Sequence, residues 1–244
     1  MKNFIKGSRD GEIGIHARFR FWWGFPCEGS SPSRGKEHPG AILSDISFRD
    51  SNFQIALIAY SAIESRISPS SVSFTFFECL KILSTHCGID EEEARKLCIS
   101  AAFHDIGMVL LPDSIICHEG VYSQKDKDAV FDHTLNGRDM ILNAGGEFSG
   151  LAAEIALTHH ENYDGTGYPY GIKGREIPFN SRVVSVADCF DAMCSDRFYR
   201  NAFTPENALD LILAERGRKY DPEILDNLRL CFDKLTEIYL NGSL

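Results

Sequence analysis

The sequence lacks any apolar run long enough to cross a membrane. Its longest such run, residues 55–60, is far shorter than the ~20 residues that a spanning helix needs. We also expect no signal peptide, because Arg9, Asp10 and Glu12 stand where such a peptide needs apolar residues. We therefore expect a cytoplasmic protein without a membrane span.

Basic stripes are lacking as well. The formal net charge is −10, whereas a nucleic-acid surface needs lysine and arginine gathered along one face. We therefore expect no DNA partner. A small anionic substrate remains compatible with this charge if metal ions and a few local arginines set the field inside a cleft.

The cysteines include no Cys-x-x-Cys pair, which argues against a zinc ribbon. Most of them stand in apolar helical contexts, so we expect reduced thiols rather than a disulfide framework. The eight cysteines are Cys27, Cys79, Cys87, Cys98, Cys117, Cys189, Cys194 and Cys231.

Strand signals are nearly absent, and helical periodicity recurs along the chain, which predicts an all-α fold. Asp90 with Glu93 and Ser123 with Asp126 have the spacing of helix-start pairs, and Gly88 suits the position after a helix end. The helices are expected at about residues 41–66, 73–87, 90–107, from 123 to beyond 133, 150–161, from 180 to beyond 191, 205–216 and 222–241.

The first part of the chain differs in composition from the rest. Aromatic residues crowd into residues 19–25, and a Gly-, Ser- and Pro-rich run, typical of a linker, follows at residues 29–40. The aromatic cluster could be a docking patch, part of a sensory subdomain or a packed satellite of the core. We expect residues 1–66 to form an extension or small subdomain and residues 67–244 to form the main helical domain.

Two adjacent histidines, His159 and His160, lead from a predicted helix into a loop with two glycines and a Tyr-Pro pair. Helical periodicity places His159 on the buried face, and His160 points about 100° away from it around the helix axis. Diverging imidazoles at one helix end can bind two neighbouring metal ions. A polar helix end followed by a glycine turn is the alternative.

Further metal-competent residues recur about one helix and one loop apart. His133 follows His104 by 29 residues, His159 follows His133 by 26, and Asp188 follows His160 by 28. Successive helices of a bundle could therefore contribute to one site. Asp105, directly after His104, could bridge two ions, which together generate a nucleophile from water and stabilise charge on a phosphoryl oxygen.

From about residue 70 to 235 the chain resembles the HD-GYP subgroup of the HD phosphohydrolase superfamily. The resemblance rests on His104-Asp105-Ile106-Gly107, His133, the stretch 159–169, Gly171-Ile172-Lys173-Gly174, Ile177-Pro178, Arg182, Ala187-Asp188, Phe190-Asp191-Ala192-Met193, Ser195-Asp196-Arg197, Tyr199-Arg200 and Tyr220-Asp221-Pro222. It implies an HD-type helical bundle that hydrolyses the bacterial second messenger cyclic di-GMP to linear pGpG, GMP or both. The family uses two or three metal ions, often iron or manganese.

The resemblance also implies residue roles. The ligands of one metal are His104, Asp105 and Asp188. The ligands of the second metal are Asp105, His133, His159 and His160. The catalytic residues are Asp105, His159, His160 and Tyr168. The substrate-binding residues are Tyr168, Lys173 and Arg182, the last as a partner of a phosphate or a carboxylate. Arg197 and Arg200 are as well suited to bonds with helix ends or aspartates as to substrate contact.

Two departures from the family pattern are visible. Met108 stands where the family has a lysine that holds the substrate phosphate, and a lost charge-assisted contact is worth ~1.5–3 kcal/mol. An early histidine ligand, expected near residues 71–73, is missing, unless water or a residue such as His38 replaces it. We therefore expect two metal ions, one of them in a weakened site, and no third.

Three functions stay open on the sequence. The first is a metal-dependent phosphodiesterase for cyclic di-GMP or a mixed cyclic dinucleotide. The second is an impaired relative that binds a cyclic dinucleotide or a signalling protein as a receptor or scaffold. The third is a phosphohydrolase for another nucleotide or phosphoester. Metal identity and oligomeric state are undetermined, and a homodimer is compatible with the sequence.

Overall fold

The computed structural model describes residues 51–67, 75–116, 122–196 and 201–241. Within these ranges the chain is helical, with one isolated bridge between Arg216 and Tyr220, which confirms the predicted all-α class. The helices are α2 (Ser51–Ile67), α3 (Thr75–His86), α4 (Glu91–Ala101), the 3-10 helix η2 (Ile106–Leu110), α5 (Asp113–Ile116), α6 (Gln124–Phe131), α7 (His133–Ala144), α8 (Ser149–Thr158), the 3-10 helix η3 (Gly174–Glu176), α9 (Phe179–Cys194), α10 (Pro205–Leu213), α11 (Pro222–Leu230) and α12 (Phe232–Asn241).

Local sequence explains where several of these helices begin and end. The Asp90 side chain accepts a hydrogen bond from the Glu93 N–H at 3.0 Å at the start of α4. Ser123 and Asp126 form the reciprocal bonds of a capping box at the start of α6. Gly88, after α3, has a φ of 85°, a conformation that glycine adopts without strain. These local predictions are confirmed.

Three predicted helices are each divided in two, which corrects the sequence interpretation. The helix expected over 90–107 ends at Ala101, and Gly107 lies within the separate 3-10 helix η2. His133 is the first residue of α7 and does not lie three turns into a continuous helix. At this junction the side chains of His133 and Thr134 bond to the carbonyls of Val130 and Phe131, at 2.5 and 3.0 Å, and such local bonds compete with helix continuation. The predicted helix over 222–241 is interrupted at Cys231, and α12 turns back onto α3.

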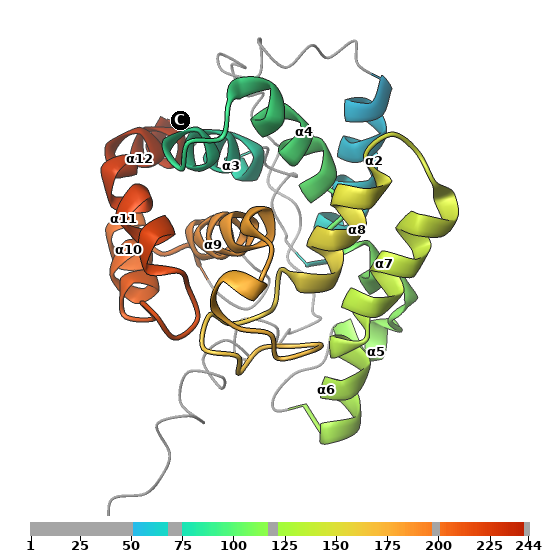
Figure 1. Cartoon of the computed structure of the whole chain (residues 1–244). Coiled ribbons are helices and arrows are strands. Elements are labelled where there is room, and N and C mark those ends of the chain that lie inside the picture. The colour runs from blue at the N-terminus through green and yellow to red at the C-terminus, as the bar shows by residue number, and fades with distance from the viewer. Residues whose placement is uncertain (1–50, 68–74, 117–121, 197–200, 242–244) are drawn as a thin grey trace, which may run out of the picture.

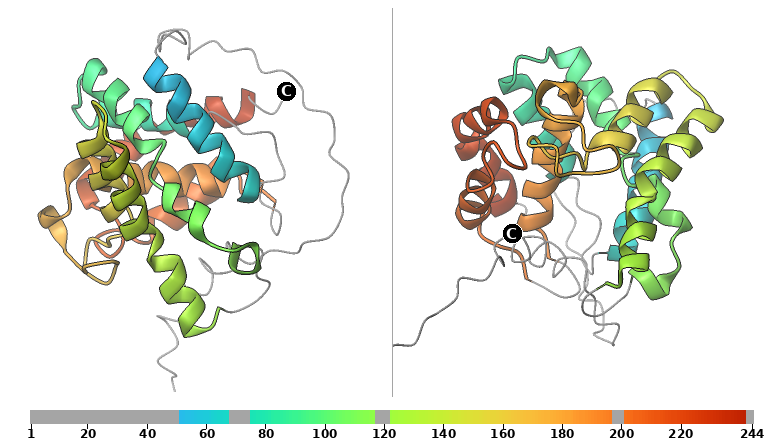
Figure 2. Two further views of the ribbon diagram at one scale, coloured as in Figure 1. Left: turned by 90° about the vertical axis from the view of Figure 1, so that its right-hand side faces the viewer. Right: turned by 60° about the horizontal axis from the view of Figure 1, so that its bottom comes forward.

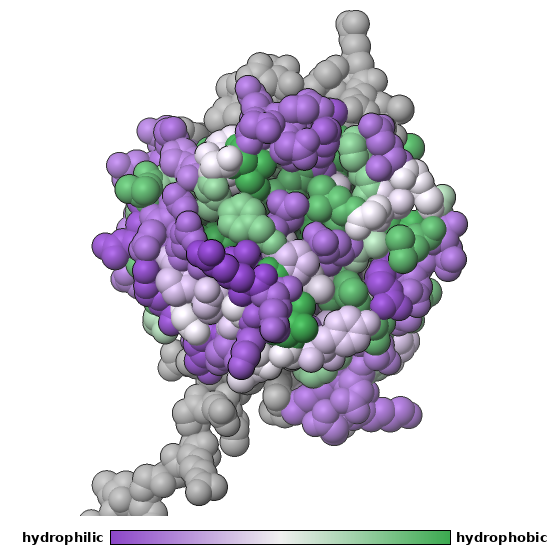
Figure 3. Space-filling model, viewed as in Figure 1, coloured by the Kyte–Doolittle hydropathy of each residue, from purple (hydrophilic) through white to green (hydrophobic). Residues whose placement is uncertain are grey.

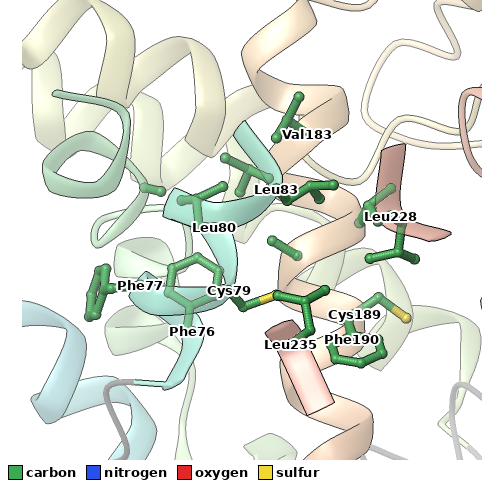
Figure 4. Close-up of a cluster of buried hydrophobic side chains, with 14 of the residues drawn as sticks. Phe76, Phe77, Cys79, Leu80, Leu83, Val183, Cys189, Phe190, Leu228 and Leu235 are labelled. Carbon is green, nitrogen blue, oxygen red and sulfur yellow. The ribbon is translucent and has the colours of Figure 1, made fainter. Parts of the chain in front are cut away.

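Helices α3 and α9 form the centre of the bundle (Figure 1). Phe76, Leu80 and Leu83 on α3 are buried and face Val183 and Phe190 on α9, as Figure 4 shows. Burying each such side chain contributes ~1.5–3 kcal/mol. The apolar stripe predicted for residues 76–83 therefore faces the core.

The remaining helices cover two sides of this centre. In Figures 1 and 2, α10, α11 and α12 lie on one side, and α7 and α8 lie side by side on the other. Polar side chains cover much of the face in Figure 3, with apolar patches between them near its centre. No helix in the described ranges is both long and apolar enough to cross a membrane.

Helix α2 packs onto this bundle although the sequence interpretation assigned it to the extension. The Tyr60 ring stacks on Phe76 with 5.5 Å between centroids and meets Phe77 edge-on at 4.9 Å. The division at residue 66 stays a prediction, because the aromatic cluster at 19–25 and the linker at 29–40 lie outside the described residues. The six cysteines within the described residues are free thiols, as predicted, and Cys27 and Cys117 lie outside them.

Candidate metal centre

The ends of several helices bring the predicted metal ligands together. His104 and Asp105 lie in the turn between α4 and η2, His133 opens α7, and His159 follows α8. A buried hydrogen bond of 2.7 Å between Thr158 and Ser181 ties the end of α8 to α9, the helix that carries Asp188. The predicted ligands, spread over 84 positions of the sequence from His104 to Asp188, therefore meet at one place in the fold.

Four of these side chains form a tight group. One ligand atom from each of Asp105, His133, His159 and His160 lies within 4.8 Å of all the others. Asp105 Oδ1 is 3.1 Å from His133 Nε2 and 3.4 Å from His159 Nε2. These distances are suited to a shared cation between the atoms.

The protonation of the histidines follows from their backbone partners. The Nδ1 atoms of His104, His133 and His159 lie 2.7, 2.5 and 3.0 Å from the carbonyls of Ala101, Val130 and Ile155. A carbonyl oxygen only accepts hydrogen bonds, so each Nδ1 carries a proton. In a neutral imidazole Nε2 is then the acceptor, and the Nε2 atoms of His133 and His159 face Asp105 Oδ1.

The atoms that face each other in this group are therefore acceptors. Asp105 Oδ1 and the Nε2 atoms of His133, His159 and His160 are buried and have no hydrogen-bond partner. Buried polar atoms without partners are costly, and several converging acceptors are typical of a cation site. The residues present thus fit a divalent metal ion.

A second pair lies on the other side of Asp105. His104 Nε2 is 3.5 Å from Asp105 Oδ2 and 3.6 Å from Asp188 Oδ1. The two oxygens of Asp105 therefore face different groups, one towards His133 and His159 and one towards His104. This geometry is compatible with a carboxylate that bridges two ions.

The electrostatic environment of the centre shifts the pKa values of His104 and His160 in opposite directions. Burial acts to lower the pKa of His104, but the negative charges and hydrogen bonds of Asp105 and Asp188 outweigh it and leave that pKa raised. Burial, with the neighbouring His159 and His133, holds the pKa of His160 well below its usual range. His160 is therefore neutral at pH 7, the form that binds metals.

The loop after α8 folds over His160. Gly167 lies so close to the start of the loop that a Cβ atom there would be 2.2 Å from the Asn162 nitrogen and 2.5 Å from the His160 carbonyl oxygen. This close approach places the Tyr168 ring on the His160 ring, with centroids 4.8 Å apart. Tyr168 therefore lies beside the metal centre, where the family resemblance expects it.

Glu161, a residue to which the sequence assigned no role, organises this loop. Its side chain is 3% exposed, and Oε1 accepts hydrogen bonds from the backbone N–H groups of Tyr170 and Gly171 at 2.8 and 3.2 Å. The signal that could have found it is its position directly after the two histidines. Charge-assisted bonds of this kind are among the stronger ones in proteins.

We expect Glu161→Ala to destabilise the protein by about 1.5–3 kcal/mol, because two backbone donors lose a carboxylate partner. Urea unfolding measures the change. Glu237→Ala, which removes an exposed glutamate from α12, is the matched control and should leave the free energy of unfolding nearly unchanged. Equal stability of the two variants would contradict this role.

Phe131 also lies in the site, although it belongs to none of the motifs found in the sequence. Its ring stacks on Tyr168 with centroids 3.9 Å apart and an angle of 16° between the planes. Tyr168 is thereby held between Phe131 and His160. Its place two residues before His133 was the available signal.

The two cations predicted to bind substrate, Lys173 and Arg182, have different surroundings in the structure. Lys173 is exposed. Arg182 forms an ion pair with Asp221 and donates a hydrogen bond to the Ile177 carbonyl at 3.0 Å. Of the two partners predicted for Arg182, a phosphate or a carboxylate, the structure therefore shows the carboxylate.

Met108 is 2% exposed in an apolar cluster with Ile63 and neighbouring residues, so its side chain is not at the centre. Arg197, Arg200, His38 and residues 71–73 lie outside the described residues.

The model of the HD domain family matches residues 58–224 of this chain. The cyclic di-GMP phosphodiesterase response regulator RpfG of Xanthomonas campestris pv. campestris (strain 8004) is 38% identical over 147 residues, which are 60% of this chain and 39% of that protein. The cyclic di-GMP phosphodiesterase of Thermotoga maritima is 36% identical over 157 residues, 64% of this chain and 43% of that protein.

The solved structure of a cyclic GMP-AMP-specific phosphodiesterase of Vibrio cholerae, V-cGAP3, has a TM-score of 0.54 at 16% identity, over 79% of this chain and 53% of that one. This likeness shows the fold. The chain belongs to the HD-domain family, in its HD-GYP subgroup. It spans about two-fifths of the length of the two curated relatives described here.

Proposed function

We propose that the protein is a metal-dependent phosphodiesterase that hydrolyses a cyclic dinucleotide, with cyclic di-GMP as the first candidate, to linear pGpG, GMP or both. The observation that carries the proposal is the convergence of the buried, partnerless Asp105 Oδ1 with the Nε2 atoms of His133, His159 and His160 beside the loop of Tyr168. The two relatives named as cyclic di-GMP phosphodiesterases support the substrate class.

Two sets of the chain's own residues would bind two metal ions, for which iron and manganese are the candidates. The first would be held by His104, Asp105 and Asp188, and the second by Asp105, His133, His159 and His160. Together the ions would supply a nucleophile from water at neutral pH and neutralise charge on the phosphoryl oxygen.

The protein residues would bind and orient the substrate around this centre. Tyr168 presents a ring already held in place by Phe131 and His160, and it would contact the substrate. His160 stays neutral because its pKa is lowered by burial, and so keeps a lone pair for a cation. Lys173, at the exposed end of the same loop, would contact outer parts of the substrate.

The test joins metal content to turnover in one sample. Protein purified anaerobically would be assayed for metals by elemental analysis, and cyclic di-GMP would be added with iron(II) or manganese(II). We expect close to two metal ions per chain and formation of linear dinucleotide or GMP. His159→Ala should lose both, whereas His86→Ala, a histidine at the end of α3, should keep both. Full metal loading without product would contradict the proposal.

A second candidate function rests on Met108. Because its side chain is buried among apolar residues, the phosphate-binding lysine of the family has no counterpart at that position. A receptor that binds a cyclic dinucleotide or a signalling protein without turnover would need no such lysine. Turnover that disappears in His159→Ala would exclude it, and parallel assays with 3'3'-cGAMP would compare substrates. The cytoplasmic location and the homodimer stay predictions.

A further inference from the structure

Three aromatic rings form one stack that begins at the metal centre. The Tyr168 ring lies on the His160 ring, with centroids 4.8 Å apart and an angle of 29° between the planes. The Phe131 ring lies on Tyr168 in turn, at 3.9 Å and 16°. Two rings at such distances on the same face of Tyr168 would overlap, so Phe131 and His160 cover its opposite faces.

This arrangement limits what Tyr168 can offer to a substrate. An aromatic side chain holds a nucleobase by stacking, which needs an uncovered ring face. Because both faces of the Tyr168 ring are covered, its hydroxyl edge is what remains for contact. The outer end of the stack is the Phe131 ring.

Phe131 has an accessible ring surface at this outer end. The residue is 38% exposed, although Tyr168 covers one face of its ring. The exposed surface therefore belongs to the other face and the ring edges. An accessible phenyl face is an apolar platform on which a planar base can stack, and such stacking needs no charged group.

The backbone holds Phe131 in a fixed place relative to the metal group. The Phe131 carbonyl accepts a hydrogen bond from the Thr134 hydroxyl at 3.0 Å, and the Val130 carbonyl lies 2.5 Å from Nδ1 of His133. The junction of α6 and α7 therefore positions the phenyl ring together with a predicted metal ligand. In a nucleotide only one ribose separates a phosphate from its base, so a phosphate at the metal group brings a base close to this ring.

We propose that Phe131 forms a nucleobase site, in which the uncovered face of its ring stacks on one purine of the cyclic dinucleotide. The proposal rests on the proposed function and deepens it, because it adds a site for a base to the site for the phosphate. Stacking does not depend on the hydrogen-bonding edge of a base. Phe131 therefore contributes in the same way to the binding of cyclic di-GMP and of 3'3'-cGAMP.

The experiment compares Phe131→Leu and Phe131→Tyr with the wild type. Leucine keeps an apolar side chain on Tyr168 but removes the planar face, whereas tyrosine keeps that face. For both cyclic dinucleotides we expect Phe131→Leu to raise KM roughly five- to a hundredfold, the size of one base–aromatic stack, with kcat close to the wild-type value. Phe131→Tyr should retain the wild-type KM. Metal content and melting temperature should stay unchanged in both variants.

Leu230→Ala is the control, because it removes a 77% exposed apolar side chain at the end of α11 and should leave KM and kcat unchanged. An unchanged KM in Phe131→Leu would overturn the proposal. So would an equal loss in Phe131→Leu and Phe131→Tyr, or a fall in kcat alone, since either would show that Phe131 only holds Tyr168 in place.

A binding measurement separates this proposal from the proposed function. If the wild type forms no product, the proposed function fails, and calorimetry with a phosphorothioate analogue of cyclic di-GMP, which resists hydrolysis, tests Phe131 by itself. Weaker binding to Phe131→Leu than to the wild type and Phe131→Tyr supports the nucleobase site. Equal affinity of the three proteins, or no binding to any of them, contradicts it.

Discussion

Asp105→Asn is expected to abolish metal binding and turnover together. The two oxygens of Asp105 face both histidine groups, Oδ1 towards His133 and His159 and Oδ2 towards His104. Asparagine keeps the shape but lacks the charge, and its amide cannot bridge two cations. Changes in outer partners of metal ligands already cost ~10–100-fold in metal affinity or activity, so loss of a carboxylate that faces both predicted metal groups should exceed ~100-fold.

Elemental analysis of the variant, together with product formation from cyclic di-GMP, measures this effect. Asp233→Asn, an exposed aspartate at the start of α12, is the control and should keep the wild-type metal content and activity. The helical content should be the same in both variants, because the asparagine has the same volume as the aspartate. Retention of two metal ions by Asp105→Asn would show that this carboxylate does not join two ions.

Gly107→Ala is expected to destabilise the fold and displace His133. A Cβ atom at Gly107 would lie 2.0 Å from the His133 carbonyl oxygen and 2.7 Å from the Gly137 nitrogen. Both are backbone atoms that cannot rotate away, so η2 and α7 have to move apart. Overpacking of a tight contact typically costs ~1–3 kcal/mol, and we expect the upper end of this range or more.

Urea unfolding gives the free-energy change, and metal content reports the displacement of His133. Gly150→Ala is the matched control, because a Cβ atom at Gly150, in the first turn of α8, meets nothing within 4 Å. Alanine in a helix is favoured over glycine by up to ~1 kcal/mol, so this control should be as stable as the wild type or slightly more. Wild-type stability of Gly107→Ala would contradict the close approach of η2 and α7.

The sequence indicated the importance of Asp105 but not the packing constraint at Gly107. Asp105 stood out because a carboxylate beside a histidine can bridge metal ions. Gly107 was interpreted as a helix stop. Its actual constraint comes from α7, whose first residue, His133, is 26 positions later and which packs directly on it.

The helix interruptions at Asp132 and Cys231 could not be predicted from the sequence, for a related reason. Periodicity continues through both positions, and neither contains the proline or glycine that usually marks a break. What decides them is where the following helix has to pack: α7 beside α8, and α12 against α3, where Leu235 is buried. Local propensity yields to such packing when the two disagree.

The sequence by itself determined the helical class, several helix starts and the identities of the metal-competent residues. These depend on periodicity, caps and motif spacing, which act over a few residues. The tertiary structure decided what each residue faces: Asp105 between two histidine groups, Phe131 on Tyr168 and Arg182 on Asp221. These contacts join residues far apart in the chain, so they exist only once the helices have packed.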